Sequence, residues 1–455
     1  MKIIEKNQRE QQPKNEAEMR KRLLCNLFLL FLAACLLNPA LCFPLQLTRR
    51  SVILWSTYIS FRNSNFSSVM ASTSSPSSSS SPPRNIIRWG LVGLGDVTQV
   101  KSGPPFYKAT GSAVVAVMRR TPGKAAEWAQ RVPGGQCVGY DSLDAFLQHD
   151  GLDAVYVATP PGSHYAIAQA AAQAGKAVYV EKPVGRCAAE TQAIADNNLT
   201  NVSQPPVYTA YISRAYKRTQ TVRTLLQEGV VGDCVTAIRY RLVGTGIVRG
   251  LDTTDKLPWR LVAAQSGGGL IMDVGCHILD RIDYLCGPLT DVQGQAQNLN
   301  SPHQRVEDYV KLRAVIGASA WASIPSQGAT VACTWDFTGR TDQEIDELII
   351  EGPKGSLLMA GMSPHLPIYI RDQDGNVVDE RTFDPPEHTA QNLIQAVTNE
   401  LRGVGSAPFL SRGDNAVRTS RVLDTVLKTY YGDREIGYWE REDEWPGAPQ
   451  SEKLK

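Results

Sequence analysis

The sequence predicts an α/β protein: an N-terminal Rossmann dinucleotide-binding domain followed by an α+β domain with a large, mostly antiparallel open sheet. A strand, a glycine turn and a helix start at residues 86–97 predict the first domain. Apolar strands at 113–118, 153–158 and 177–180, separated by helical segments, continue the same alternation. Several period-two segments between two helical zones predict the second domain.

The chain of 455 residues is long enough for two domains with sizeable cores. We divide it into a targeting leader with a Ser/Pro-rich linker (1–85), a Rossmann domain (86–207), an α+β domain (208–439) and a loose tail (440–455). The tail is assigned from its acidic, proline and glycine residues.

The net charge of +2 conceals an uneven distribution. Residues 1–85 carry 11 Lys and Arg against four Glu, which leaves 36 Lys and Arg against 41 Asp and Glu in the body. A mildly acidic body without a basic run argues against a nucleic-acid partner.

The leader has the features of a targeting segment. A basic flank, Arg20-Lys21-Arg22, precedes an uncharged apolar stretch from Leu23 to Cys42, which is typical of a secretory signal. A membrane anchor is the alternative, because that stretch approaches the length of a span. Residues 43–89 then carry five Arg and no acid, so the whole resembles the bipartite presequence of complex plastids. If translation starts instead at Met70, the Ser/Pro tract is a disordered tail on a cytoplasmic protein.

The cysteines predict no disulfide framework and no metal site. Three of the nine lie in the leader, and the other six form neither a CxxC pair nor a cluster with histidines. We therefore expect free thiols and a reducing compartment. We also expect no stable membrane insertion of the mature body and a small-molecule substrate as its partner.

The glycine turn predicts a dinucleotide site. Gly93 and Gly95 follow an apolar strand, and Asp96 and Val97 open the next helix, where backbone N–H groups can approach a pyrophosphate. Thr98 stands where the fingerprint has its third glycine. The motif alone is weak, but the strand that follows at 113–118 completes the βαβ unit.

The end of that second strand favours NADP over NAD. An NAD enzyme usually places an acid here to hold the ribose hydroxyls, whereas this chain has Arg119 and Arg120 followed by Thr121. Two guanidiniums suit the 2′-phosphate of NADP, although NAD stays possible.

Two further loops end strands at the same sheet edge. Thr159 and Pro160 lead into a helix predicted to be capped by Ser163, with His164 at its start as a positional rather than a catalytic residue. We expect Thr159, Pro160 and His164, together with Glu181 and Lys182 of the next loop, to contact the cofactor. Downstream, a short apolar strand ends at Glu181-Lys182-Pro183, so it delivers a lysine to the carboxyl edge, where open α/β sheets bind ligands.

Residues 266–283 contain the highest concentration of candidate catalytic residues. Three glycines, 267–269, allow a sharp turn into a helix on which Asp273, His277 and, less directly, Asp280 share one face. A carboxylate one turn from an imidazole can orient it and raise its proton affinity, as suits a base near neutral pH.

Together these motifs resemble the glucose-fructose oxidoreductase and inositol dehydrogenase family (Gfo/Idh/MocA). The resemblance is carried by the Gly93 turn, Ala158-Thr159-Pro160-Pro161 with His164, Glu181-Lys182-Pro183, and Asp-x-Gly-x-His ending at His277. It implies a dehydrogenase or reductase acting on CH–OH groups of a sugar, polyol or related ring alcohol. It implies roles for three residues: His277 as general acid/base, Asp273 as its partner and substrate ligand, and Lys182 as donor to the reacting oxygen.

The resemblance also implies a substrate pocket and an assembly. Tyr211 and Arg214 resemble the family's Tyr-x-x-Arg crossing between domains, and Trp259 and Arg260 resemble a segment that walls its substrate pocket. The second domain is then expected to bind substrate and to form a homodimer or higher oligomer through the exposed face of its sheet.

Two other functions stay open at this point. The family includes redox-neutral glycosidases with tightly bound NAD, and a non-catalytic NADP-sensing regulator is the binding-module alternative. Intact Lys182, Asp273 and His277 count against the sensor, because a sensor need not retain all three.

The second domain is expected to contain these further elements: strands at 306–315, 318–324, 330–337, 348–351, 356–360 and 368–371, and helices at 218–228, 388–402 and 415–430.

Overall fold

The computed structural model describes residues 85–196, 206–244, 257–299, 305–340, 343–384, 386–441, 443 and 445–446. The predicted targeting leader therefore lies outside the described residues. No helix in the described part is long and apolar enough to cross a membrane.

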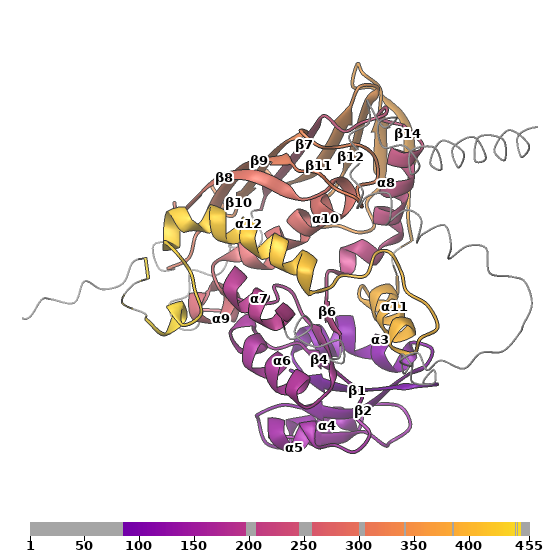
Figure 1. The fold of residues 1–455 in the computed structure, drawn as a ribbon, viewed down its shortest axis with the longest axis vertical. Coiled ribbons are helices and arrows are strands. Elements are labelled where there is room, and N and C mark those ends of the chain that lie inside the picture. Colours follow the sequence, from indigo (N-terminus) through magenta and orange to yellow (C-terminus); the bar gives the residue numbers. More distant parts are fainter. Residues whose placement is uncertain are drawn as a thin grey trace, which may run out of the picture. The chain divides into compact units, whose positions relative to one another are not determined.

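The first domain is a parallel six-stranded sheet in the order β3-β2-β1-β4-β5-β6, as the Rossmann prediction requires (Figure 1). Its strands are β1 (Ile87–Val92), β2 (Ser112–Met118), β3 (Val138–Tyr140), β4 (Ala154–Val157), β5 (Ala177–Val180) and β6 (Val207–Thr209). Its helices are η2 (Val97–Ser102), α3 (Gly103–Lys108), α4 (Lys124–Ala129), α5 (Leu143–Leu147), η3 (Pro161–Ser163), α6 (His164–Gln173) and α7 (Ala188–Asp196).

The sheet is buried on both faces, which explains its unbroken apolar strands. In β4, Val155 and Val157 join the core that includes Ala168 of α6. The alternate residues, Ala154 and Tyr156, join a second core that includes Phe106 of α3 and also α11 (Gln391–Leu401). Helices therefore cover both sides of the sheet.

The boundary predicted at residue 207 cuts through β6. Val207, Tyr208 and Thr209 all pair with β5, so the first sheet ends at Thr209. The two domains are also not independent, because α12 (Gly413–Tyr431) packs against α7, and α11 packs against α3. The described residues, which begin at Asn85, form one compact unit.

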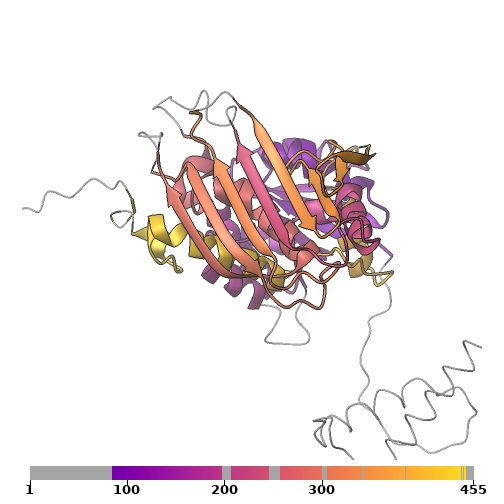
Figure 2. The same cartoon turned by 90° about the horizontal axis from the view of Figure 1, so that it is seen from above.

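The second sheet has eight strands in the order β14-β13-β12-β11-β7-β10-β9-β8. All neighbours are antiparallel except β7 and β10, which run parallel, so the prediction of a mostly antiparallel sheet is confirmed. Figure 2 shows this sheet with its helices behind it and one face open. The strands are β7 (Ala237–Val243), β8 (Leu289–Gln297), β9 (Tyr309–Ile316), β10 (Thr330–Asp336), β11 (Ile345–Gly352), β12 (Gly355–Met359), β13 (Ile368–Arg371) and β14 (Val377–Arg381).

In the second sheet, β7, β8 and β14 were not predicted, as β3 was not in the first sheet, and one predicted strand is wrong. Residues 318–324 form no strand but part of the loop between β9 and β10. The Ser319 hydroxyl accepts hydrogen bonds from the Trp321 and Ala322 N–H groups, and this local turn competes with a ladder.

The remaining helical elements are η4 (Ile212–Ala215), α8 (Lys217–Gln227), η5 (Trp259–Leu261), α9 (Ala263–Ser266), η6 (Ile271–Gly275), α10 (Cys276–Cys286) and η7 (Tyr438–Glu440). Every residue of α10 is buried, because it lies in the main core and also packs against α12. The predicted helices at 218–228, 388–402 and 415–430 are confirmed as α8, α11 and α12.

The predicted loose tail is wrong for its first residues. Trp445 is only 8% exposed, and its indole Nε1 donates to the Tyr438 carbonyl at 3.2 Å. Arg305 donates to the Trp445 and Pro446 carbonyls. One buried aromatic residue therefore outweighs the loop-like composition around it.

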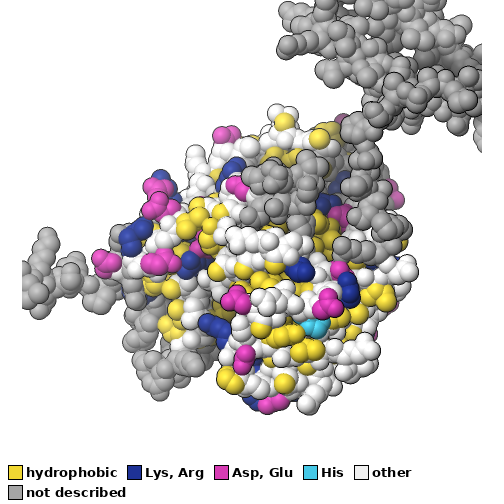
Figure 3. All heavy atoms as spheres, turned by 60° about the horizontal axis from the view of Figure 1, so that its bottom comes forward, with side chains coloured by type: hydrophobic (Ala, Val, Ile, Leu, Met, Phe, Trp, Pro, Cys, Tyr) yellow, Lys and Arg dark blue, Asp and Glu magenta, His cyan; other side chains and the backbone are white. Residues whose placement is uncertain are grey.

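On the face shown in Figure 3, no single sign of charge dominates, and the six cysteines of the body are unpaired. Acidic and basic side chains are interspersed over the face shown in Figure 3. Cys137, Cys187, Cys234, Cys276, Cys286 and Cys333 are free thiols.

Candidate active site

The turn after β1 is shaped for a closely approaching ligand. Gly93 has φ of +93°, and a Cβ there would lie 2.7 Å from the Ala158 backbone. Gly95 has no atom within 4 Å of where its Cβ would stand, so its backbone is open to a phosphate. Asp96 and Val97 begin η2, and the Thr98 hydroxyl donates to the Gly93 carbonyl at 2.6 Å. Thr98, in place of a third glycine, therefore braces the turn.

The two arginines after β2 take different positions. Arg119 Nη1 donates to the Leu94 carbonyl at 3.1 Å, and Arg119 lines a cavity of about 250 Å³. Arg120 is exposed and does not line that cavity. The sequence analysis missed the other cations there; the full lining is Leu94, Gln99, Arg119, Lys124, Glu127, Trp128 and Arg131.

His164 connects the loops that follow β4 and β5. Its ring nitrogens lie 2.7 Å from the Thr159 carbonyl and 3.1 Å from the Pro183 carbonyl. The ring is fully buried, and burial lowers its pKa below the ordinary value. His164 thus holds the two loops together, and direct contact with a cofactor, as predicted for it, is contradicted by its burial.

The predicted capping role of Ser163 is also wrong. Its hydroxyl donates to Thr159 Oγ1 at 2.9 Å and to the Pro160 carbonyl at 3.1 Å, rather than capping α6. A single turn of η3 precedes α6 and redirects the side chain into the loop.

Glu181 fixes the end of β5 from inside the domain. Its carboxylate accepts a hydrogen bond from the Tyr156 hydroxyl, which also lies 2.9 Å from the Ser102 hydroxyl of η2. Burial raises the pKa of Glu181, against the opposing charge of Lys182. These hydrogen bonds, which run from Ser102 of η2 through Tyr156 to Glu181, thereby link the helix after the glycine turn to the strand end that carries Lys182.

Lys182 and Asp273 meet although they are 91 residues apart in the sequence. Lys182 Nζ donates to Asp273 Oδ1 at 2.6 Å and to the Asp273 carbonyl at 2.8 Å, and Arg260 Nε donates to Asp273 Oδ2 at 2.7 Å. Burial alone would raise the pKa of Asp273, but the charges of Lys182 and Arg260 hold it well below its usual range. Burial alone would lower the pKa of Lys182, but Asp273 outweighs this and raises it.

His277 does not use Asp273 as predicted. Residues 271–275 form a π-helical segment, so the spacing of an α-helix does not hold between the two residues. No hydrogen bond joins them in the described part of the chain; Asp273 binds Lys182 and Arg260 instead.

The predicted rise in the proton affinity of His277 is wrong. Burial lowers the pKa of His277 well below its ordinary value, and the charge of Lys182 lowers it further, against a weaker opposing effect of Asp273. The ring lies edge-on to Tyr211, with 6.4 Å between ring centroids. At neutral pH, His277 is therefore an uncharged imidazole.

Tyr211 and Arg214 are buried residues that support the site and do not reach a substrate. Tyr211 is 1% and Arg214 is 5% exposed. The guanidinium of Arg214 holds the Asp280 carboxylate through three contacts of 2.7–3.1 Å. This corrects the substrate-binding role predicted for both residues, and the Asp280 carboxylate is occupied by Arg214. Trp259, in contrast, is half-buried and lies under Arg260, 4.4 Å from the guanidinium carbon to the ring centroid.

The three-glycine turn brings the Asp273 segment against the loop after Lys182. Gly267 and Gly268 have φ of +85° and +155°, which only glycine adopts without strain. A Cβ on Gly267 would lie 2.5 Å from the Arg186 carbonyl oxygen. Larger residues would therefore push the two catalytic segments apart.

Arg434 is a supporting residue that the sequence analysis missed. Its side chain is fully buried, and Nη1 donates to the Gly267 carbonyl and, at 3.4 Å, to the Arg186 carbonyl. Nη2 pairs with Asp424, whose other oxygen accepts the Ala188 N–H at 2.7 Å. A lone arginine far from any motif offers no signal in the sequence.

Replacing Arg434 by lysine is expected to lower kcat about tenfold, because one ammonium cannot reach both carbonyls and Asp424 in the same planar geometry. KM for the dinucleotide should change little, and steady-state kinetics measure the two separately. Arg421→Lys, on the exposed side of α12, is the matched control. A folded Arg434→Lys protein with unchanged kcat would contradict this role.

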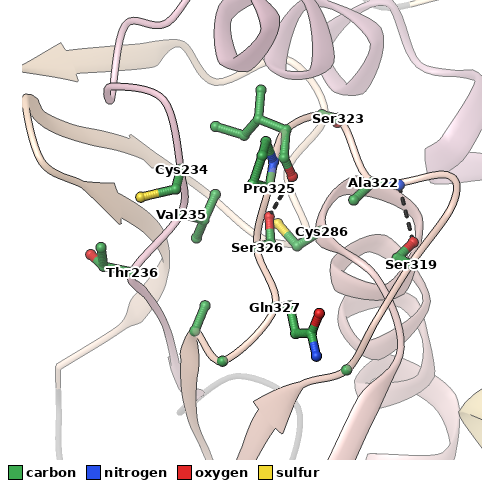
Figure 4. A pocket seen from close by; sticks show the side chains of 14 residues that line it. Cys234, Val235, Thr236, Cys286, Ser319, Ala322, Ser323, Pro325, Ser326 and Gln327 are labelled. Carbon is green, nitrogen blue, oxygen red and sulfur yellow. Dashed lines mark hydrogen bonds between the residues drawn. The ribbon is translucent and has the colours of Figure 1, made fainter. Parts of the chain in front are cut away.

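A larger cavity than the one beside Arg119 lies elsewhere. It has a volume of about 760 Å³ and is lined by uncharged residues, including Cys234, Cys286, Ser319, Ser323 and Gln327, around the β9–β10 loop (Figure 4). It contains none of the residues of the Lys182 cluster, so size alone does not identify the chemical site.

Two family models match the chain. One, described as "Oxidoreductase family, NAD-binding Rossmann fold", matches residues 87–199, and the other, described as "GFO/IDH/MocA C-terminal domain", matches residues 219–358.

Curated relatives match over most of their length. A dTDP-3,4-didehydro-2,6-dideoxy-alpha-D-glucose 3-reductase of Saccharopolyspora spinosa is 30% identical over 73% of this chain and 93% of the relative. An oxidoreductase of Formosa agariphila is 28% identical over 75% of this chain and 99% of the relative.

The fold is also that of solved structures. An aldose-aldose oxidoreductase from Caulobacter crescentus, complexed with glycerol, superposes with a TM-score of 0.61 at 22% identity, over 76% of this chain and 97% of that one. Together with the parallel first sheet and the open second sheet, these matches show that the chain belongs to the Gfo/Idh/MocA family of oxidoreductases.

Proposed function

We propose that this oxidoreductase transfers a hydride between C4 of the NADP nicotinamide and a hydroxyl or carbonyl carbon of a sugar, polyol or related ring alcohol. The observation that carries the proposal is the contact of Lys182 with Asp273, at 2.6 Å, beside the neutral His277. The sugar enzymes among the relatives support the substrate class.

The residues divide the work of oxidation between them. Neutral His277 takes the hydroxyl proton on a ring nitrogen, and Lys182 donates a hydrogen bond to the oxygen as the C–O bond gains double-bond character. Asp273 orients the Lys182 ammonium and keeps it charged. Bound NADP supplies the hydride acceptor. In reduction the same proton returns from His277 to the oxygen.

The decisive measurement is a screen of the purified protein with NADP⁺ and NAD⁺ against sugars, polyols and dihydrodiols, following nicotinamide absorbance. Net reduction of the nucleotide is expected with at least one alcohol. Substrate cleavage with a dinucleotide that is neither consumed nor released would instead indicate the glycosidase alternative. Nucleotide binding without turnover would indicate the sensor.

Arg119 is the residue on which the NADP preference is expected to depend. It lines the cavity beside the glycine turn together with Lys124 and Arg131, and the acid there, Glu127, pairs with Lys124 at 2.8 Å. Arg119→Gln is expected to lower kcat/KM with NADP⁺ about tenfold and to change the value with NAD⁺ much less. The same substitution at the exposed Arg120 should have the smaller effect; equal loss with both nucleotides would contradict the assignment.

We further propose a homodimer formed through the open face of the second sheet. This face carries basic residues on β7 and β9 (Arg239, Arg241, Lys311 and Arg313) and acidic residues on β11 (Glu347 and Glu351). Two copies related by a two-fold axis could place these stripes against each other. Sedimentation of the body as a monomer at micromolar concentration would contradict the proposal.

The plastid-type leader is likewise a proposal, supported by its basic, apolar and acid-free segments. Amino-terminal sequencing of the mature protein tests it, because processing near residue 85 agrees with a leader and a start at Met70 agrees with the cytoplasmic alternative.

A further inference from the structure

The carboxylate of Asp273 is shared by two cations. Lys182 and Arg260 bind it through contacts of 2.6 and 2.7 Å. The Lys182 and Asp273 side chains are 15% and 20% exposed, and Arg260 is the most exposed of the three. Asp273 therefore binds only part of the Arg260 guanidinium, and this is the part of the cluster that is open to solvent.

Arg260 has hydrogen-bonding capacity left over. Its Nε is used by Asp273, whereas no partner among the described residues binds its two terminal amino groups. The side chain is 36% exposed and lies on the Trp259 ring, which limits its rotation. A guanidinium that is fixed in position and has unused N–H groups along one edge can bind an oxyanion through two parallel hydrogen bonds. We call this edge, with its two terminal amino groups, the free edge of Arg260.

Two further cations act on the ring of His277. Lys101, exposed on η2, and Arg281, one turn after His277 on α10, both lower the pKa of His277. Arg281 is buried; its Nη1 donates to the Gly361 carbonyl at 2.7 Å, and the charges of Asp346 and Asp280 oppose its own. Of the two cations, Lys101 is the one that is exposed.

Glu181, the other carboxylate beside Lys182, offsets the charge of Lys182 but does not bind Arg260. Among the described residues it accepts hydrogen bonds from the Tyr156 hydroxyl and the Lys182 N–H group. The terminal amino groups of Arg260 therefore stay available to a ligand.

We propose that the substrate is a hydroxy compound that also carries an oxyanion, a carboxylate or a phosphate, bound by the free edge of Arg260. The inference rests on the proposed function and narrows its substrate class from neutral sugars and polyols to their acidic derivatives. The oxyanion pairs with the N–H groups of Arg260 that Asp273 leaves unused.

The test is a comparison of binding by three matched hexoses, D-glucose, D-glucuronate and D-glucose 6-phosphate, to the full chain saturated with NADPH. The reduced nucleotide prevents alcohol oxidation and places the cofactor's own phosphates before the sugar is added. Calorimetry is expected to show at least one anionic hexose binding about tenfold or more tightly than D-glucose, and the difference should shrink at high salt. The two anionic arms distinguish a carboxylate from a phosphate.

Variants assign the effect to Arg260. Arg260→Gln is expected to weaken the anionic hexose about tenfold, to leave D-glucose and NADPH binding unchanged, and to be partly restored in Arg260→Lys. Arg421→Gln, an exposed residue bound only to Gln192 among the described residues, is the matched control.

Equal binding of the three hexoses, tighter binding of D-glucose, or no saturable binding of either anionic hexose at millimolar concentration would overturn the inference. The readout needs no turnover. If the substrate screen shows no hydride transfer while the anionic preference stands, the proposed function fails and the anion site does not.

Discussion

Replacing Lys182 by methionine is expected to lower kcat by a factor of about 10²–10³, the cost of removing one preorganised donor to a developing oxyanion. Methionine keeps the length of the side chain but donates no hydrogen bond. The affinity for NADP should change little, because the glycine turn and Arg119 belong to other strands. Steady-state kinetics and fluorescence titration with NADPH measure the two quantities independently.

Lys176→Met is the matched control, because Lys176 precedes the same strand and, among the described residues, its side chain donates only to the Leu152 carbonyl, at 2.9 Å. It should keep kcat near that of the unmodified protein. A Lys182→Met protein with normal turnover would remove Lys182 from the mechanism and leave its ion pair with Asp273 as a structural contact.

Replacing His277 by asparagine is expected to lower kcat for alcohol oxidation by a factor of about 10²–10⁴, the usual contribution of a positioned general base. The pH profile gives a second signature. Because burial and Lys182 hold the pKa of His277 below its ordinary value of about 6.5, the ring stays neutral through the neutral range. kcat/KM should therefore be flat from neutral pH to below about 6.5 and fall only as the pH drops through the folded-state pKa.

The acid limb of the profile should vanish in His277→Asn and persist in His365→Asn, which changes an exposed histidine. In Lys182→Met, NMR titration should show the His277 pKa moving upward, because the nearby positive charge is gone. A limb centred above about pH 6.5 in the unmodified protein would contradict the lowered pKa.

Much of the fold could be predicted from the residues of short segments taken one at a time. The Gly93 turn needs a positive φ, and apolar runs such as Ala177–Val180 are buried on both faces, so both are readable one segment at a time. The position of Lys182 was predictable for the same reason, because a strand that stops at Pro183 must end at the carboxyl edge of the sheet.

Pairing between distant segments was not predictable. Spacing placed Asp273 beside His277, yet Asp273 is 2.6 Å from Lys182, and a π-helical segment changed the spacing. Arg214 is a residue type that often binds substrates, but in this protein Asp280 binds it in the core. Trp445 lies in an acidic, proline-containing end but packs against Trp439, with 5.7 Å between ring centroids.

The sequence by itself therefore predicted the two-domain α/β architecture and the dinucleotide turn, and it singled out Lys182, Asp273 and His277 as the candidate chemical residues. Backbone conformation and burial of a short segment depend mainly on that segment's own residues. The tertiary structure alone decided which charges pair, the neutral state of His277 and the supporting place of Arg434. Those properties depend on distance and on the exclusion of water, and both arise only when segments nearly a hundred or more residues apart come together.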